Sequence, residues 1–207
     1  MTLKSADSAL ATLFEYDDFV VGEHLERMRK YVEILLDHCD EEWNLSALEK
    51  ERIVLASVLH DAGKSVVPTE ILSKPSGLTE EEFNKVKMHT IAAADVFARA
   101  SVVCEEIGVE NSDMLLAVEV ALHHHEKWDG TGYPLRLKGE EIPFPARVIA
   151  IADVYDALTS RRPYKRPWTH EEAYRTIVDD SGLHFDPVLV EVFKNCAAKF
   201  KSVSDDE

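Results

Sequence analysis

Hydrophobic positions along most of this chain recur with the period of an α-helix. Over residues 23–39 the apolar positions fall on one stripe of a helix, with charged residues on the opposite face. These positions are Leu25, Met28, Val32, Leu35 and Leu36. The same reasoning predicts helices over 46–63, 79–100 and 169–178, and buried helices over the apolar runs 114–126 and 146–160. No β-branched run alternates cleanly, so the pattern predicts an all-α protein.

Local start and stop signals support three of these helices. A Ser or Thr followed three residues later by Glu is a capping box, in which the two residues satisfy free amides at a helix start. The pairs are Ser46 with Glu49, Thr79 with Glu82, and Thr169 with Glu172. The helix that begins at Ser46 is expected to end at Gly63. Turn-forming residues cluster in 67–77 and 129–145, which predicts two long loops able to carry function.

Composition places the chain among ordinary globular proteins. It has 207 residues, of which 45% are hydrophobic and 30% charged. No apolar run approaches the roughly 20 residues needed to span a bilayer, and the acids near the N-terminus do not fit a signal peptide. The three cysteines show no CxxC spacing, so neither a disulfide framework nor a zinc ribbon is indicated. We therefore expect a cytoplasmic protein without a membrane partner.

Net charge narrows the class of partner. The formal charge of −16 is a poor match to a protein that coats a nucleic-acid polymer. One basic island, RRPYKR at 161–166, interrupts this acidic background. Such an island suits a compact anionic ligand, although a solvated turn fixed by Pro163 explains it equally well on charge alone.

Several residues of metal-ligand type stand where helices should be apolar. His60 and Asp61 follow the run IVLASVL, and Asp153 interrupts VIAIADVYDAL. Lys64 lies one helical turn beyond His60. A buried carboxylate needs a partner, and each residue alone could be a helix cap or a member of a core ion pair. Their recurrence on different helices, with three consecutive histidines at 123–125, favours a metal site.

Taken together, the motifs resemble the HD-GYP domain, a branch of the HD metal-dependent phosphohydrolases that hydrolyses cyclic di-GMP. They are HDAGK (60–64), PTEILSKPSGLTEEE (68–82), His89, HHEKWDGTGYP (124–134), ARVIAIADVYDALTSRRPYK (146–165) and GLHFDP (182–187). The resemblance implies an HD-domain helical bundle with additional C-terminal helices and a GYP loop. It covers residues 19–200, which leaves 1–18 as an N-terminal extension and 201–207 as an acidic, frayed tail.

The resemblance also implies a centre of two divalent ions, iron or manganese. Its ligands would be His24, His60, Asp61, His89, His124, His125 and Asp153. One ion would lie among His24, His60, Asp61 and Asp153, and Asp61 would bridge to a second ion held by His89, His124 and His125. Helical geometry turns His123 away from this set. We expect His38, His170 and His184 to be surface or structural residues.

Substrate contacts follow from the same resemblance. Asp61 and Lys64 would be the catalytic residues, with Lys64 holding a phosphate oxygen. The other contacts would be Asp156 on the guanine edge, Arg162 and Lys165 on base or phosphate, and Gly132, Tyr133 and Pro134 as a wall of the pocket. Some family members carry a Glu that binds a third ion at the position of Val20, so a dinuclear centre is expected.

The activity implied is hydrolysis of cyclic di-GMP to linear pGpG and, more slowly, to GMP. Partners would be cyclic di-GMP and, among proteins, diguanylate cyclases or response regulators. Two alternatives stay open. The substrate could be another dinucleotide such as cyclic GMP-AMP or a linear one, because base identity depends on pocket details. The chain could also be a non-catalytic receptor or adaptor that contacts diguanylate cyclases through the GYP loop.

Overall fold

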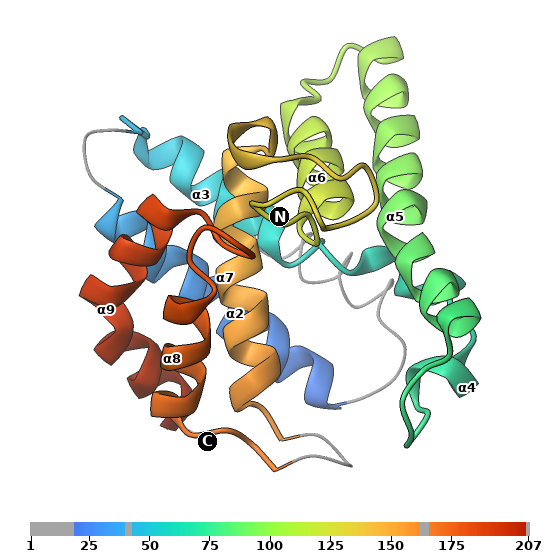
Figure 1. The fold of residues 1–207 in the computed structure, drawn as a ribbon. Helices are drawn as coiled ribbons and strands as arrows, with labels where there is room; N and C mark the ends of the chain where they lie inside the picture. Colours follow the sequence, from blue (N-terminus) through green and yellow to red (C-terminus); the bar gives the residue numbers. More distant parts are fainter. Residues whose placement is uncertain (1–18, 40–42, 162–165, 206–207) are drawn as a thin grey trace.

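A computed structural model describes residues 19–39, 43–161 and 166–205 (Figure 1). The helices are α2 (Phe19–His38), α3 (Ala47–Ser57), α4 (Thr69–Leu72), α5 (Glu80–Glu106), α6 (Ser112–His123), α7 (Phe144–Thr159), α8 (His170–Asp179) and α9 (Pro187–Asp205). Two 3-10 turns, η1 (Ala62–Val66) and η2 (Gly139–Glu141), interrupt the loops. Extended pairing in these residues is limited to a single bridge between Ser181 and Phe185. The predicted all-α class is confirmed.

Two hydrophobic cores hold the helices together. The larger core joins α2, α7, α8 and α9, and its centre is aromatic: the Tyr31 ring stacks on Phe200 with centroids 4.7 Å apart and meets Tyr155 edge-on at 5.2 Å. The smaller core joins α5 and α6 to the turn after α3 through Leu59, Phe97 and their neighbours. In Figure 1, α8 and α9 lie on one side and α5 and α6 on the other, with α2 and α7 between them; α3 contacts both α2 and α6.

The three predicted capping boxes are confirmed at the starts of α3, α5 and α8. The end predicted for the first of these helices is wrong, because α3 stops at Ser57 instead of Gly63. Residues 62–66 instead form η1, which packs directly on α5. A Cβ atom at Gly63 would lie 1.9 Å from the His89 carbonyl oxygen, so this close approach requires glycine. His60 and Asp61 consequently lie in a turn between α3 and η1.

The C-terminal region contains α9, a helix for which the hydrophobic pattern gave no range, although the resemblance implies additional C-terminal helices. Helix α9 buries Leu189, Phe193 and Phe200 in the larger core and continues to Asp205. Val203, one turn beyond Phe200, also packs on that core. The expected frayed tail from residue 201 is therefore wrong for residues 201–205, because an apolar contact extends the helix.

None of the helices in the described part of the chain combines the length and apolarity needed to cross a membrane.

Candidate metal centre

Two groups of histidine and aspartate side chains meet where the two cores adjoin. The first group is Asp61, His89, His124 and His125, and the second is His24, His60 and Asp153; within each group the ligand atoms lie within 4.8 Å of one another. They come from α2, the turn after α3, α5, the end of α6, and α7. All seven metal ligands expected from the sequence are thus brought together in two neighbouring groups.

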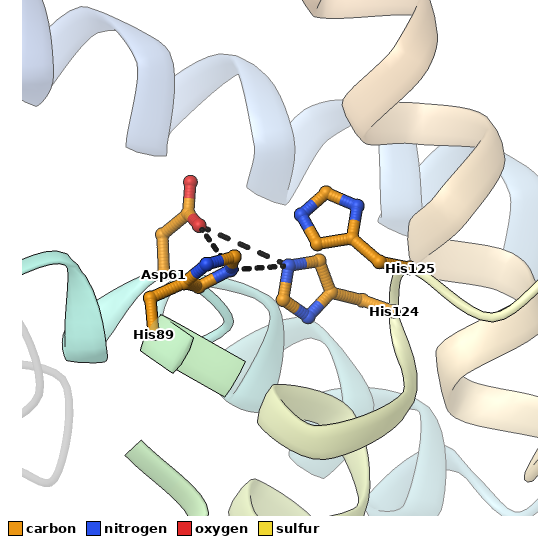
Figure 2. A group of neighbouring side chains, drawn as sticks. All are labelled: Asp61, His89, His124 and His125. Carbon is orange, nitrogen blue, oxygen red and sulfur yellow. Dashed lines mark hydrogen bonds and ion pairs between the residues drawn. The ribbon is translucent and has the colours of Figure 1, made fainter. Parts of the chain in front are cut away.

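The first group converges on one point between its side chains (Figure 2). The Oδ1 atom of Asp61 lies 3.3 Å from His89 Nε2 and 3.8 Å from His124 Nε2. The two Nε2 atoms are themselves 3.4 Å apart. His125 lies beside them, with its ring centroid 4.0 Å from that of His124.

Backbone carbonyls decide which ring nitrogen faces this point. His89 Nδ1 lies 2.6 Å from the Val86 carbonyl oxygen, and His124 Nδ1 lies 3.1 Å from two carbonyl oxygens of α6. His60 Nδ1 likewise lies 2.6 Å from the Ser57 carbonyl oxygen. A carbonyl can only accept, so each Nδ1 carries the proton and donates it. The Nε2 atoms of the neutral His89 and His124 rings therefore present lone pairs to the site, and His60 Nε2 does so when its ring is neutral.

Converging lone pairs and a carboxylate fit a cation. His60 Nε2 and Asp61 Oδ1 are buried and have no hydrogen-bond partner among the described residues. Buried polar atoms without a partner are costly, and a divalent ion would satisfy imidazole and carboxylate ligands together. The residues present fit a divalent metal ion on this ground.

Asp61 lies between the two groups. Its Oδ1 atom faces His89 and His124, whereas its Oδ2 atom is 3.2 Å from His60 Nε2. His60 Nε2 is in turn 3.8 Å from Asp153 Oδ1 in the second group. One carboxylate is therefore placed to serve both groups.

The electrostatics of the site favour neutral histidines in the first group. Burial lowers the pKa of His89, lowers that of His124 well below its usual value, and brings the pKa of His125 to about 4. At His60 burial also opposes the charged form, but the carboxylates of Asp61 and Asp153 outweigh it and raise the pKa to about 9.

Lys64 reaches the Asp61 carboxylate from the solvent side. Its Nζ atom forms an ion pair with Asp61 Oδ2, and its side chain is 45% exposed. Although burial raises the pKa of Asp61, the charges of Lys64 and His60 outweigh burial and hold that pKa well below its usual range. Lys64 thus places a positive charge beside the two groups of ligands.

The GYP loop is held against this site by contacts with residues 125–127. Glu126, whose role the sequence analysis missed, is buried and accepts from the Leu135 amide at 2.6 Å and from the Leu137 amide at 3.1 Å. A Cβ atom at Gly132 would lie 2.3 Å from the Lys127 nitrogen, so the loop can pass this closely only with glycine there.

Tyr133 brings the GYP loop to the metal ligands. Its amide donates to the His125 carbonyl at 3.2 Å, and its ring centroid lies 4.8 Å from that of His125. Pro134 follows through a cis peptide bond. The sequence analysis expected Gly132, Tyr133 and Pro134 to line the site, and the structure places the loop beside it.

The segment 182–187 supports the start of the same loop. Trp128 donates its amide to the His184 carbonyl at 3.1 Å, and Asp129 donates to the Leu183 carbonyl at 2.9 Å. Asp186 is buried and pairs with Arg147 of α7 at 2.7 Å. The sequence analysis found this motif but could not give its structural role, because that role depends on contacts between distant segments.

Asp156, which is expected from the resemblance to contact guanine, is bound by other side chains of the protein in this structure. Asp156 is buried in α7, and its carboxylate accepts hydrogen bonds from Arg27, His24 and Ser160. Both carboxylate oxygens of Asp156 therefore already accept hydrogen bonds from the protein itself. Arg162 and Lys165, the other expected base or phosphate contacts, lie outside the described residues. The side chain of Val20, in the first turn of α2, is also outside the described part.

The remaining histidines lie outside both groups of ligands. His123 is the last residue of α6, and its Nδ1 atom is buried without a hydrogen-bond partner in the described residues. His38 Nδ1 lies 2.7 Å from the Ile34 carbonyl, and His170 Nδ1 lies 2.9 Å from the Tyr155 hydroxyl. His184 stacks on Phe185, and burial brings its pKa to about 4.

Comparison with known proteins identifies the family. Residues 15–189 match the HD domain, and the chain belongs to the HD domain family. A protein of Vibrio cholerae named cyclic di-GMP phosphodiesterase is 41% identical over 200 residues, which cover 95% of this chain and 40% of that protein. A Thermotoga maritima protein of the same name is 42% identical over 185 residues, covering 89% of this chain and 46% of that protein. The resemblance to HD-GYP proteins is confirmed.

Other relatives carry a different substrate in their names. The 3′3′-cGAMP-specific phosphodiesterase 2 of Vibrio cholerae is 39% identical over 183 residues, which cover 88% of this chain and 33% of that protein. The crystal structure of a cyclic GMP-AMP specific phosphodiesterase of the same organism, V-cGAP3, aligns with a TM-score of 0.56 at 21% identity, covering 88% of this chain and 47% of that one. That likeness supports the fold. The chain spans less than half the length of all these relatives.

Proposed function

We propose that this chain is a metal-dependent phosphodiesterase domain that hydrolyses cyclic di-GMP to linear pGpG and, more slowly, to GMP. The observation that carries the proposal is the convergence of Asp61 Oδ1 with the unprotonated Nε2 atoms of His89 and His124. The names of relatives about 40% identical supply the substrate. Such an activity would lower the level of a second messenger.

The proposal includes two divalent ions, with iron or manganese as the metals. One ion would be held by His24, His60 and Asp153, and the other by His89, His124 and His125, with Asp61 shared. Mixed imidazole and carboxylate ligands suit both metals. When bound, a pair of such ions activates water and neutralises phosphoryl oxygens.

The residues around the ions have distinct roles in this proposal. Hydrolysis adds one water across the P–O3′ bond: the water oxygen bonds to phosphorus, and the 3′ oxygen leaves with a proton. Lys64 would neutralise a non-bridging oxygen as negative charge grows on the phosphoryl group. The loop of Gly132, Tyr133 and Pro134 would confine the substrate, and Arg162 and Lys165 would bind its base or phosphate.

A second candidate is hydrolysis of another cyclic dinucleotide. It is supported by the 3′3′-cGAMP-specific relative at 39% identity. A receptor or adaptor that contacts diguanylate cyclases through the GYP loop is less well supported, because all seven expected ligands are present and grouped. Diguanylate cyclases and response regulators remain the proposed protein partners, and a relative from Xanthomonas campestris, 37% identical, is itself named a cyclic di-GMP phosphodiesterase response regulator. A cytoplasmic location is part of the same proposal.

A turnover assay with three substrates distinguishes these candidates. Manganese-loaded and iron-loaded protein would each receive cyclic di-GMP, 3′3′-cGAMP and pGpG at equal concentration, with products separated by chromatography. We expect cyclic di-GMP to be consumed fastest, with pGpG as the first product. Faster loss of 3′3′-cGAMP would favour the second candidate, and binding of cyclic di-GMP without turnover would favour the receptor.

A further inference from the structure

Helices α2 and α7 pack side by side (Figure 1). Each contributes two polar residues one turn apart to the contact between them. On α2 these residues are His24 and Arg27, and on α7 they are Asp153 and Asp156. His24 and Asp153 belong to the second group of ligands. Arg27 and Asp156 lie outside that group and form an ion pair with each other.

Asp156 connects the two helices through its carboxylate. Its Oδ2 atom lies 2.7 Å from His24 Nδ1 and 3.1 Å from Arg27 Nη2, and its Oδ1 atom accepts from Arg27 Nε at 2.5 Å. The Ser160 hydroxyl donates to Oδ2 at 3.1 Å and accepts from Arg27 Nη2 at 2.8 Å. Arg27 and Asp156 are both buried, with side chains 7% and 3% exposed.

His24 is held differently from three other histidines of the site. The Nδ1 atoms of His60, His89 and His124 are held by carbonyls of their own helices or turns, which no side-chain substitution removes. The Nδ1 atom of His24 is held by a side chain of another helix. Its orientation therefore depends on one carboxylate and on the arginine that fixes that carboxylate.

A buried Arg–Asp pair contributes little net stability, because desolvation offsets the attraction between the charges. Its effect on His24 is specific, however. A carboxylate can only accept, so it keeps the proton of His24 on Nδ1 and leaves the Nε2 lone pair available. A carboxylate behind a metal-bound imidazole also makes the ring a stronger ligand.

We propose that Asp156, fixed by Arg27, is a positioning residue that holds His24 in the tautomer and orientation required for an ion at the His24–His60–Asp153 group. This inference rests on the proposed metal centre. It replaces the guanine contact expected from the sequence with a role at the metal ligand. It predicts that substitution of Asp156 changes metal occupancy at one group and leaves the other occupied.

The test compares Asp156→Asn and Arg27→Lys with the wild-type chain. An Asn amide can donate to Nδ1, which favours the tautomer protonated on Nε2 and blocks ligation. We expect Asp156→Asn to weaken one of two Zn²⁺ binding events by about 10–100-fold, with a smaller loss for Arg27→Lys. The exposed pair Asp95 and Arg99, joined at 2.9 Å on α5, supplies the matched controls Asp95→Asn and Arg99→Lys, which should bind Zn²⁺ as wild type does.

Histidine ¹⁵N–¹H correlation spectra report which ring nitrogen of each histidine is protonated. A general loss of stability would not change this tautomer. In the wild-type chain we expect His24 to be protonated on Nδ1. In Asp156→Asn, Zn²⁺ should still shift the His89 and His124 signals, whereas His24 should respond only at higher Zn²⁺. Because the wild-type tautomer is measured directly, the test holds even if a variant does not fold.

Three outcomes separate the possibilities. An Nε2-protonated His24 in the wild-type chain would overturn the positioning role. Unchanged Zn²⁺ binding in Asp156→Asn, with a raised KM for cyclic di-GMP, would restore the guanine contact. A wild-type chain that binds no metal would overturn the proposed function itself, and the tautomer of His24 would still report on the contact with Asp156.

Discussion

The Nε2 atoms of His89 and His124 lie 3.4 Å apart, and neither is protonated, because each ring carries its proton on Nδ1. Two lone pairs at this separation repel, and the nearby Asp61 Oδ1 adds negative charge. A protein that folds into this arrangement sets up repulsion that a bound cation relieves.

Metal uptake should release protons at neutral pH. His60 has a pKa of about 9 in the metal-free protein and is therefore protonated at pH 7, but a metal ion binds only the neutral ring. The pKa values of His89, His124 and His125 are lowered, so these rings are already neutral and release none. Below the pKa of His60 the proton competes with the metal ion for the ring. The apparent affinity for the metal should therefore rise about tenfold per pH unit from pH 7 towards pH 9.

Calorimetric titration with Mn²⁺ in two buffers of different ionisation enthalpy measures this release. We expect close to one proton per chain at pH 7 and less at pH 9. Heats that do not depend on the buffer at pH 7 would contradict a protonated His60.

The three consecutive histidines should differ sharply in importance. His124→Ala and His125→Ala each remove a residue of the first group, so metal content should drop and turnover should fall to background. His123→Ala removes a ring outside both groups and should keep most of the metal and activity. Metal analysis and turnover of all three variants provide the comparison. Loss of metal in His123→Ala alone would show that the wrong pair has been identified as ligands.

Glu126→Gln should loosen the GYP loop without emptying the metal site. Gln keeps one acceptor for the amides of Leu135 and Leu137 but replaces the other oxygen with a donor. Leaving a buried amide without an acceptor costs about 1–3 kcal/mol. Hydrogen exchange at residues 133–138 should therefore accelerate about tenfold or more, and kcat/KM should fall.

The matched control is Glu140→Gln, because Glu140 is exposed in the same loop region. That variant should exchange and turn over as wild type does. Equal exchange in Glu126→Gln and wild type would mean that the carboxylate does not hold the loop.

The linear product should accumulate before GMP. Linear pGpG carries an additional terminal phosphate, and Val20 offers no ligand for a third ion that could neutralise it. A time course should show pGpG rising well before GMP. Val20→Glu should raise the metal content and speed the second cleavage. GMP formation without detectable pGpG in the wild-type chain would contradict this reading of Val20.

Sequence periodicity and capping boxes predicted the class of fold, because both signals are local. The end of α3 could not be read in this way, since it depends on Gly63 meeting the backbone of α5. Helix α9 was predictable in principle: Leu189, Phe193, Cys196 and Phe200 recur at helical spacing and are all buried.

The residues of the candidate site were predicted mainly from motifs. Motifs could not predict a residue's role where that role depends on partners brought together by the fold. The seven expected ligands are grouped as the motifs implied. The contacts of Asp156 could not be predicted, because its spacing from Asp153 says nothing of Arg27, which approaches from another helix. Glu126 stood inside a recognised motif, but only the folded loop shows which amides its carboxylate accepts.

Metal content and cyclic di-GMP turnover, measured on the same anaerobically purified sample, test the central claim most directly. The wild-type chain should contain about two iron or manganese ions and produce pGpG, and removal of the metal should abolish turnover. Asp61→Asn, which removes the shared charge with little change in shape, should lose metal and activity while keeping its helical circular dichroism. Full turnover by metal-free wild type or by folded Asp61→Asn would contradict a metal centre built on Asp61.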